Sequence, residues 1–174
     1  MQKFIIWGKE SKFFKLLIKT LLFVLFFYII FTFVLGIHYC TDNNMYPKIG
    51  NGDLVVTYKL ERLNINDPVL YKASDGKIHC GRIIAASGDE VKIDKQGNLI
   101  VDDGVKIEEI FYPTSQGKYG SVENKEEKGY KVKENSYFIL NDFRSDINDS
   151  RTYGVINKKD IKGKVVFQMR CRGF

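Results

Sequence analysis

The chain of 174 residues has few of the side chains that build metal centres or covalent cross-links. It contains three cysteines and two histidines, and neither a CxxC nor an HxxxH spacing occurs. Three cysteines are too few for a disulfide scaffold, and this spacing offers no zinc ligand set. The sequence therefore predicts no metal and no cofactor. We expect Cys80 in the core and Cys171 at the surface, while a disulfide between Cys40 and Cys171 is neither predicted nor excluded.

The motifs of several common enzyme classes are also missing. The chain has no glycine-rich phosphate-binding loop and no GxSxG nucleophile elbow. Two cysteines have a histidine nearby, Cys80 next to His79 and Cys40 close to His38. Adjacent side chains on a strand point to opposite faces, so His79 is badly placed to act as a base for Cys80. The individual residues therefore indicate no active site of a common type.

Basic residues are concentrated at the N-terminal end. The net charge is +6, from 27 lysines and arginines against 21 acidic residues. The first 19 residues hold five lysines and one glutamate, a net +4, which leaves +2 for the other 155. A protein that binds nucleic acid would carry its basic patch on the folded part of the chain. We therefore expect no nucleic-acid partner, and the charge points to a membrane instead.

An uncharged run of 18 residues, 20–37, follows these lysines. It has the lower limit of length for a helix that spans a bilayer, and the Lys19 side chain is able to reach the headgroups. The run is longer than the apolar core of a typical signal peptide, and no A-x-A-like site follows it, so we expect an uncleaved anchor in contact with membrane lipid. The positive-inside rule then places residues 1–19 in the cytoplasm and residues 38–174 outside the plasma membrane.

Residues 38–174 have the pattern of a mainly β domain, a sandwich or barrel. Short runs rich in β-branched and aromatic residues alternate with turn signals such as Asn51-Gly52. Residues 115–133 are rich in glycine, lysine and glutamate, and we expect an exposed loop or flexible hairpin there. The predicted strands are Leu54–Tyr58, Pro68–Tyr71, Gly81–Ala86, Glu90–Ile93, Asn98–Val101, Ser136–Leu140 and Gly163–Met169.

Three ordered segments carry a resemblance to a known family. They are Asn44-Met45-Tyr46-Pro47 with Gly52-Asp53, then Gly81-Arg82-Ile83-Ile84 with Gly88-Asp89, then Asn141-Asp142-Phe143-Arg144 with Asp149-Ser150-Arg151 and Gly154. In this order, behind an N-terminal anchor, they resemble bacterial type I signal peptidases. The resemblance covers residues 42–166, most of the external domain, and it predicts a signal-peptidase-like β fold.

In that family a serine and a lysine perform the reaction. The serine of a Ser-Met-x-Pro segment is the nucleophile, a lysine directly before an Arg-Val-Ile segment is the general base, and a second serine orients the lysine. The lysine needs a desolvated pocket that lowers its pKa before it can take the serine proton. The resemblance places these three roles at Asn44, Gly81 and Ile147 of this chain.

These three positions depart from the family pattern. Asn44 has no nucleophilic oxygen, Gly81 has no side chain, and Ile147 puts an apolar group where a hydroxyl is needed. Loss of a nucleophile alone typically lowers the rate by about 10⁴–10⁶-fold, so we expect no catalytic residues. Further departures are Asn141, Phe143 and Ser87. Substitute nucleophiles at Thr41, Ser145 or Ser150, with Lys48 as base, find no support in the spacing.

Other residues match the family pattern and have expected binding or structural roles. The resemblance implies a groove for an extended peptide, in which main-chain hydrogen bonds give affinity. Asp149 and Arg151 are expected to form a structural ion pair. The groove is assigned to Asp42, Asn44, Met45, Pro47, Val69, Tyr71, Gly81 and Ile83. The supporting residues are Arg82, Asp142, Arg144, Asp149 and Arg151.

These features favour a binding protein without peptidase activity. In Gram-positive bacteria, signal-peptidase-like proteins encoded with pilus genes assist sortase-driven polymerisation of pilins, and some of them lack the serine and the lysine. The chain resembles that group through its single short anchor, its small external domain and its lost dyad. We expect an accessory protein or chaperone that binds pilin or sortase at the outer face of the membrane, around Asp42–Pro47, Val69–Tyr71 and Cys80–Ala85.

Two alternatives stay open. The first is an active serine endopeptidase that processes exported preproteins, which Asn44 and Gly81 oppose. The second is a membrane-surface scaffold whose fold persists without a ligand. Cleavage of a signal peptide would favour the first alternative. Peptide binding that is unaffected by substitutions in the groove would favour the second.

Overall fold

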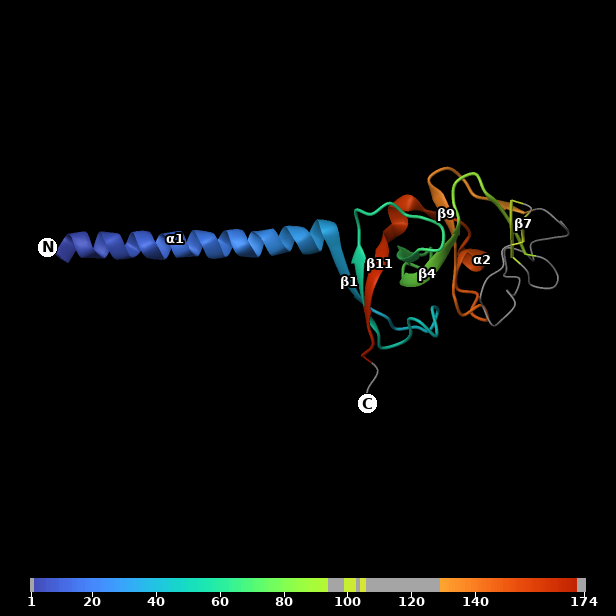
Figure 1. The fold of residues 1–174 in the computed structure, drawn as a ribbon, viewed down its shortest axis with the longest axis horizontal. Coiled ribbons are helices and arrows are strands. Elements are labelled where there is room, and N and C mark those ends of the chain that lie inside the picture. Colours follow the sequence, from blue (N-terminus) through green and yellow to red (C-terminus); the bar gives the residue numbers. More distant parts are fainter. Residues whose placement is uncertain (1, 94–98, 103, 106–128, 172–174) are drawn as a thin grey trace. The chain divides into compact units, whose positions relative to one another are not determined.

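The computed structural model describes residues 2–93, 99–102, 104–105 and 129–171. The chain divides into two compact units, Met1–Leu35 and Gly36–Phe174. The first unit holds a long helix and the second holds almost all the strands (Figure 1). Residues 115–128 of the predicted loop and residue 98 of one predicted strand lie outside the described residues.

The N-terminal unit is built from one apolar helix. α1 spans Gln2–Ile29 and continues into a π-helical turn, η1, at Ile30–Val34. The stretch Lys12–Val34 contains 18 consecutive residues with a mean hydropathy of 2.5, and it is long and apolar enough to cross a membrane. The helical stretch ends before Leu35, because the last residues of the predicted apolar run enter strand β1, Leu35–Tyr39.

Seven strands form the larger sheet of the C-terminal unit. They are β1, β2 (Leu54–Tyr58), β3 (Pro68–Lys72), β4 (Ile78–Ala85), β9 (Ser136–Leu140), β10 (Ile156–Asn157) and β11 (Ile161–Met169). Their order in the sheet is β1-β2-β11-β3-β4-β9-β10, and each pairing from β2 to β10 is antiparallel. β11 lies between β2 and β3, so a strand from far along the chain completes the middle of the sheet.

A second, smaller sheet contains four antiparallel strands in the order β7-β6-β5-β8. Their bounds are β5 Glu90–Ile93, β6 Leu99–Val101, β7 Gly104–Val105 and β8 Tyr130–Lys131. β8 pairs with β5, and Val132 beside it is buried. The described end of the segment predicted as a loop or hairpin is therefore a strand followed by a core residue. A short helix, α2 (Ser150–Tyr153), and a 3₁₀ turn, η2 (Lys158–Asp160), complete the unit.

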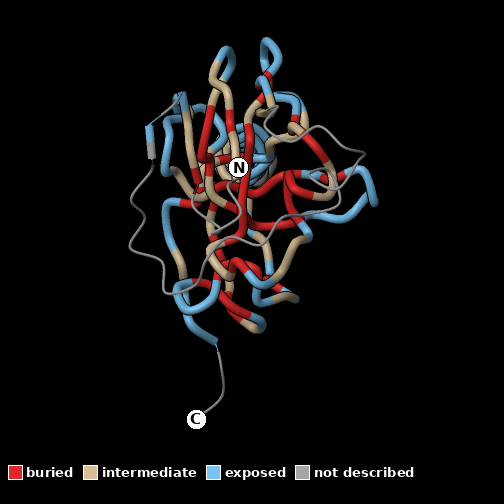
Figure 2. The backbone as a smooth tube through the Cα atoms, turned by 90° about the vertical axis from the view of Figure 1, so that its right-hand side faces the viewer, coloured by how far each residue is buried: buried red, intermediate tan, exposed pale blue. Residues whose placement is uncertain are grey.

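The core consists of three clusters of buried apolar side chains. Figure 2 colours all buried residues red, polar ones included, along the backbone. β4 contributes to all three, because successive residues point to opposite faces and the strand is long enough to reach two clusters along its length. Cys80 packs with Val55 on one face, and Ile83 packs with Val69 on the other. Each side chain of this size stabilises the fold by about 1.5–3 kcal/mol when fully buried.

The three cysteines are free thiols, with Cys40 and Cys80 buried and Cys171 exposed. The core position predicted for Cys80 and the surface position predicted for Cys171 are confirmed. Burial, together with the nearby Asp42 and Asp53 carboxylates, raises the pKa of Cys40 to about 11. Burial also raises the pKa of Cys80 well above its usual value, so neither core cysteine is a reactive thiolate at neutral pH.

The mainly β fold predicted from the sequence is confirmed. Strands β2, β5 and β9 have the predicted bounds, while β4 begins three residues earlier than predicted. Strands β1, β7, β8 and β10 were not predicted. Three of these four are only two residues long and are held by pairing with a neighbour, which leaves no sequence period to detect.

Candidate functional site

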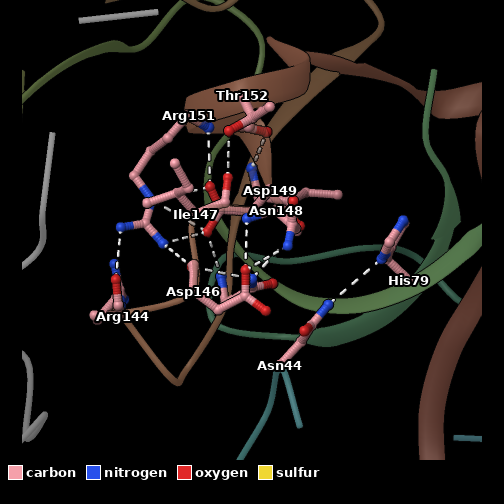
Figure 3. A network of polar contacts seen from close by, with 12 residues as sticks. Asn44, His79, Arg144, Asp146, Ile147, Asn148, Asp149, Arg151 and Thr152 are labelled. Atoms are coloured by element: carbon pink, nitrogen blue, oxygen red, sulfur yellow. Dashed lines mark hydrogen bonds and ion pairs between the residues drawn. The ribbon is translucent and has the colours of Figure 1, made fainter. Parts of the chain in front are cut away.

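Three segments bring polar side chains together around His79, on one face of β4. The Nδ2 of Asn44 lies 3.4 Å from His79 Nδ1, and Asp75 Oδ2 lies 2.9 Å from His79 Nε2. Asp42 Oδ2 is 3.8 Å from the same Nδ1 atom. Figure 3 shows the Asn44 amide directed at the imidazole. An imidazole with a partner at each nitrogen is therefore the centre of the site.

Asn44 is fixed by backbone contacts on both sides. Its carbonyl oxygen accepts a hydrogen bond from the Phe143 N–H at 3.0 Å, and its N–H donates to Asp42 Oδ1 at 3.4 Å. The turn that follows contains a cis peptide bond between Tyr46 and Pro47. Asn44 is 2 % exposed, so its side chain has little freedom to leave the imidazole.

Two aromatic rings enclose the imidazole. The ring centroids of Tyr71 and Tyr153 lie 6.0 and 5.5 Å from that of His79, and both rings are tilted by about 35° against it. The Tyr153 hydroxyl also donates to Asp75 Oδ2 at 3.2 Å. Asp75 thus accepts hydrogen bonds from both His79 and Tyr153, and its position is set by the turn between β3 and β4.

The two carboxyl groups of the site differ in their electrostatics. Burial raises the pKa of Asp42, and this outweighs the hydrogen bond from Asn44 N–H and the nearby His79. For Asp75 the partial burial also acts to raise the pKa, but hydrogen bonds from His79 and from the Lys77 N–H outweigh it and lower the pKa. The surroundings therefore favour the ionised form of Asp75 and disfavour that of Asp42.

Gly81 lies two residues beyond His79 on the same face of β4, in closely packed surroundings. A Cβ atom added there would lie 2.5 Å from Ile139 Cγ2 and 3.1 Å from Tyr71 Cε1. It would also lie 3.3 Å from the Leu140 carbonyl oxygen. Tyr71 is itself fully buried, so no side chain fits at position 81 without movement of its neighbours.

A network of buried charges lies beside this site. Asp149 and Arg151 form an ion pair with 2.7 Å between Oδ2 and Nη2, and both side chains are buried. Asp149 also accepts hydrogen bonds from the N–H groups of Asn141 and Arg151, each at 2.9 Å. Arg151 donates to the carbonyl oxygens of Arg144, at 2.8 Å, and Asp146. The predicted ion pair of Asp149 and Arg151 is confirmed.

Other predicted supporting residues join the same region. Arg82 makes a bidentate ion pair with Asp142, with 2.8 Å from Nε to Oδ1 and 2.5 Å from Nη2 to Oδ2. Its Nη1 donates to the Asn66 carbonyl oxygen. Arg144 is fully buried. Ile147 is partly buried, and its carbonyl oxygen accepts a hydrogen bond from the Thr152 hydroxyl at 2.5 Å.

The residues predicted to line a peptide groove differ in exposure. Most of them are buried, Asp42 is half-buried and Pro47 is exposed. Pairing with β3 covers Ile78–Arg82 of β4, whereas pairing with β9 covers Arg82–Ala85. Within the described part of the chain, no strand pairs with the second edge of residues 78–81. The buried groove residues are Asn44, Met45, Val69, Tyr71, Gly81 and Ile83.

The substitute nucleophiles considered from the sequence do not gather around a base. Ser150 is buried, and its hydroxyl oxygen accepts a hydrogen bond from the Ile139 N–H at 2.9 Å. Thr41, Ser145 and Lys48 are exposed. Among the described residues, no group of three His, Cys, Asp or Glu side chains has an arrangement that could hold a metal ion.

Sequence reasoning missed the pair of Asp75 and His79. The two residues are separated by one turn of a hairpin, and the register of β3 with β4 places His79 opposite Tyr71. The only sequence signal was the turn sequence Asp75-Gly76 directly before a strand that carries a histidine. The contact between His79 and Asn44 joins residues from distant parts of the chain, so no local sequence pattern predicts it.

A family model and similar proteins of known sequence agree on one family. The family model "Signal peptidase, peptidase S26" matches residues 13–170. A protein of Staphylococcus aureus strain N315 named "Inactive signal peptidase IA" is 32 % identical over 156 residues, covering 87 % of this chain and 88 % of that protein. "Signal peptidase IB" of S. aureus strain COL is 25 % identical over 154 residues, with 81 % of each chain covered. A crystal structure of a signal peptidase I from Enterococcus faecalis V583 aligns with a TM-score of 0.46 and 18 % identity, over 61 % of this chain and 98 % of that one.

Proposed function

The chain belongs to the signal peptidase family, peptidase S26, and from that premise we propose that it is a member without proteolytic activity. It acts as a membrane-anchored accessory protein that binds an exported polypeptide. The partner that we propose is a pilin subunit or the sortase that polymerises pilins. The relatives named as inactive support the first part, and the resemblance to pilus-locus proteins supports the second.

One observation carries the proposed loss of activity: neither position 44 nor position 81 holds a side chain that can perform the serine–lysine reaction of the family. Position 44 holds a buried carboxamide instead of a hydroxyl. Position 81 holds a glycine whose surroundings leave no room even for a Cβ atom, because Ile139 Cγ2 would lie 2.5 Å from it. A lysine there could not replace the missing base without repacking Tyr71 and Ile139. The family reaction therefore lacks both its nucleophile and the space for its base.

The proposed binding mode is addition of an extended peptide to a strand. Such addition needs a row of backbone N–H and C=O groups with no strand on the other side. Residues 78–81 of β4 extend beyond the end of β9, and Ile78 at the start of this segment is 38 % exposed. The exposed side chains of Tyr46 and Pro47 follow Asn44 in the neighbouring loop. This edge is where we place the polypeptide, and neither a serine nor a lysine is required for it.

The location that we propose follows from the helix and the charges before it. The stretch Lys12–Val34 is able to cross a membrane, and the basic residues precede or begin it. We propose that the N-terminus is cytoplasmic and that the C-terminal unit faces outward. The test is labelling of intact cells with a membrane-impermeant maleimide, which should modify exposed Cys171 and leave the Cys171→Ser variant unlabelled. Labelling only after the cells are broken would show the opposite orientation, with the C-terminal unit in the cytoplasm.

The decisive experiment combines cleavage with binding. The full chain in lipid vesicles is incubated with a preprotein that carries a signal peptide, and then with purified pilin and purified sortase in separate reactions. A photo-crosslinking residue replaces Tyr46, which is 49 % exposed, and the matched control replaces the exposed Lys159. We expect no cleavage, and crosslinks to pilin or sortase from position 46 only. Cleavage by the parent chain would favour an active peptidase, in line with the name "Signal peptidase IB" of a relative.

A second outcome separates the accessory protein from a scaffold without a ligand. Equal crosslinking from positions 46 and 159, or none from either, would favour the scaffold. Deletion of the gene with loss of pilus polymers would support the accessory role, provided that the Asn44→Ala variant restores them. That variant keeps the site non-catalytic, so restoration would show that the function does not depend on a residue-44 nucleophile.

A further inference from the structure

The two ring nitrogens of His79 have different partners. The Asn44 Nδ2 group is a hydrogen-bond donor and lies 3.4 Å from Nδ1, so Nδ1 faces it as an acceptor. Nε2 lies 2.9 Å from the Asp75 carboxylate, which accepts hydrogen bonds only, so this contact favours a proton on Nε2. In a neutral imidazole these two contacts favour the tautomer with the proton on Nε2, which directs the lone pair of Nδ1 at the side chain of residue 44.

We propose that this chain retains a proton-accepting residue for the side chain at position 44, and that the residue is His79, positioned by Asp75, rather than anything at position 81. Asn44 then occupies the place of a nucleophile in an arrangement of three groups: residue 44, histidine and aspartate. This rests on the proposed function and deepens it, because the family lysine stays excluded at position 81 while a different base faces the position of the lost nucleophile.

The geometry around the imidazole supports this role. His79 is 8 % exposed, and the rings of Tyr71 and Tyr153 enclose it on two sides. The Tyr153 hydroxyl contacts the same carboxylate oxygen as His79 does, which fixes Asp75 from a second direction. An imidazole oriented by a carboxylate and shielded from water is the arrangement that takes a proton from a hydroxyl or thiol.

The chemistry needs only one change in the side chain. With a hydroxyl or thiol at position 44, its oxygen or sulfur would form a bond to the carbonyl carbon of an acyl substrate. The proton would pass to His79 Nδ1, and from there to the leaving group as the carbon–oxygen or carbon–nitrogen bond breaks. Asn44 has no such proton-bearing nucleophile, so the parent chain holds the base without a reactive partner.

Every charged or titratable group that faces the imidazole enters the test. Asp42 and Asp75 flank it, Tyr71 packs on it from β3, and Tyr153 packs on it from α2. Burial keeps the phenol of Tyr71 neutral, since its pKa lies well above the usual value. Desolvation and the nearby Asp75 raise the pKa of Tyr153 to about 12, so its phenol is also neutral between pH 5 and 9. Titration between pH 5 and 9 therefore reports on residue 44, the histidine and the two carboxylates.

The experiment places a thiol at position 44 in the full chain. The Asn44→Cys variant is made in a Cys171→Ser background, because Cys171 is the exposed native thiol. Thiolate formation is followed by ultraviolet absorbance, which needs no access for a reagent, and then by alkylation with iodoacetamide, in which the sulfur displaces iodide. We expect the thiol pKa to fall to about 3.5–7.5, as for other thiols paired with histidine.

The matched control adds His79→Gln, which keeps a side chain of similar size. There we expect the thiol pKa to return to about 8.5 or higher, with alkylation at pH 7 at least roughly tenfold slower. Asp75→Asn in the same background should give an intermediate value, because the imidazole loses its orienting carboxylate. Coinciding titration curves for the variants with and without His79 would overturn the proposal.

A measurement on the parent chain guards against variants that fail to fold. The chain has two histidines, so ¹⁵N-histidine NMR spectra with His38→Gln as an assignment control report His79 directly. We expect the neutral tautomer with the proton on Nε2 at pH 7. A proton on Nδ1, or on both nitrogens, would overturn the proposal, since no lone pair would then face residue 44. Neither measurement depends on cleavage of a preprotein, so their failure is distinguishable from failure of the proposed function.

Discussion

The loop that carries Asp149 and the segment around Asn44 lie side by side, and they differ in what holds them (Figure 3). Asp149 and Arg151 are buried, charged and satisfied by several hydrogen bonds each. Asn44 and Gly81 are also buried, but they are uncharged, and one of them has no side chain at all. Both regions belong to the part of the chain that resembles the catalytic core of signal peptidases.

The difference shows which family features serve the fold and which serve the reaction. A buried ion pair cannot lose one partner without leaving an uncompensated charge, so the supporting residues are tied to stability. A nucleophile and a deprotonated lysine have no such structural role, and a buried lysine is even costly to desolvate. Replacement at positions 44 and 81 therefore leaves the fold intact while the supporting network must stay.

The largest effect is expected from Arg151→Ala. The change leaves the Asp149 carboxylate buried without its ion-pair partner, and it removes hydrogen bonds to the Arg144 and Asp146 carbonyl oxygens. We expect the free energy of unfolding to fall by about 3–5 kcal/mol, measured by urea denaturation of the full chain in detergent. The exposed Lys159→Ala serves as control and should leave the midpoint unchanged. Equal midpoints for both variants would remove the distinction between the two regions.

A smaller effect is expected from Gly81→Ala, on the other side of the comparison. The added methyl group would meet Ile139 Cγ2 at 2.5 Å, and we expect a loss of about 1–3 kcal/mol from overpacking. Gly104→Ala is the control, because the nearest atom to its added Cβ is 3.4 Å away. Adding Ile139→Leu, which lacks the Cγ2 methyl, should recover part of the loss. If Gly81→Ala is as stable as the parent chain, position 81 has room and the argument against a lysine there fails.

The smallest effect on stability is expected at the two carboxyl groups next to His79. Replacement of one should stabilise the chain at neutral pH, and replacement of the other should destabilise it. The pKa of Asp42 is raised in the folded chain, so its ionisation opposes folding above about pH 4. Asp42→Asn should therefore stabilise the chain slightly at pH 7 and have no effect at pH 3. The pKa of Asp75 is lowered, so its contribution is present above about pH 4 and is lost as the pH falls. Asp75→Asn should destabilise at pH 7 and lose this effect in acid.

The measurement is thermal unfolding of both variants and the parent across pH 3–8. Opposite signs at neutral pH, converging in acid, are the expected result. Shifts of the same sign for both variants would contradict the electrostatic difference between the two carboxyl groups.

The sequence predicted the larger features of the fold because they depend on local patterns. β2 alternates buried and partly buried residues over its whole length, and β5 and β9 are bounded by turn residues. β1 escaped prediction because Leu35–Ile37 continue the apolar run of the helix, and only pairing with β2 makes them a strand. When the end of a helix and the strand that follows it are both apolar, the local sequence pattern does not show the boundary between them.

The candidate site was predictable only in part, for the same reason. The ion pair of Asp149 and Arg151 is separated by two residues, so proximity in the sequence indicated it. The group of Asn44, His79 and Asp75 depends on the register of β3 with β4 and on a loop held by Phe143. Tertiary contacts of that kind are fixed by packing, and no spacing in the sequence encodes them. The closed space at Gly81 likewise depends on Ile139 and Leu140 from another strand.

The position of β11 has a consequence for how the C-terminal unit is made. β2 and β3 are not neighbours in the sheet, because β11 pairs with both of them. During synthesis, therefore, the first strands emerge with an empty place between them, and residues 161–169 must arrive before the two halves of the sheet can join. Contacts between such distant segments form slowly, since the intervening chain has to be ordered first. The order of strands thus leaves the larger sheet in two separate parts until residues 161–169 have been synthesised.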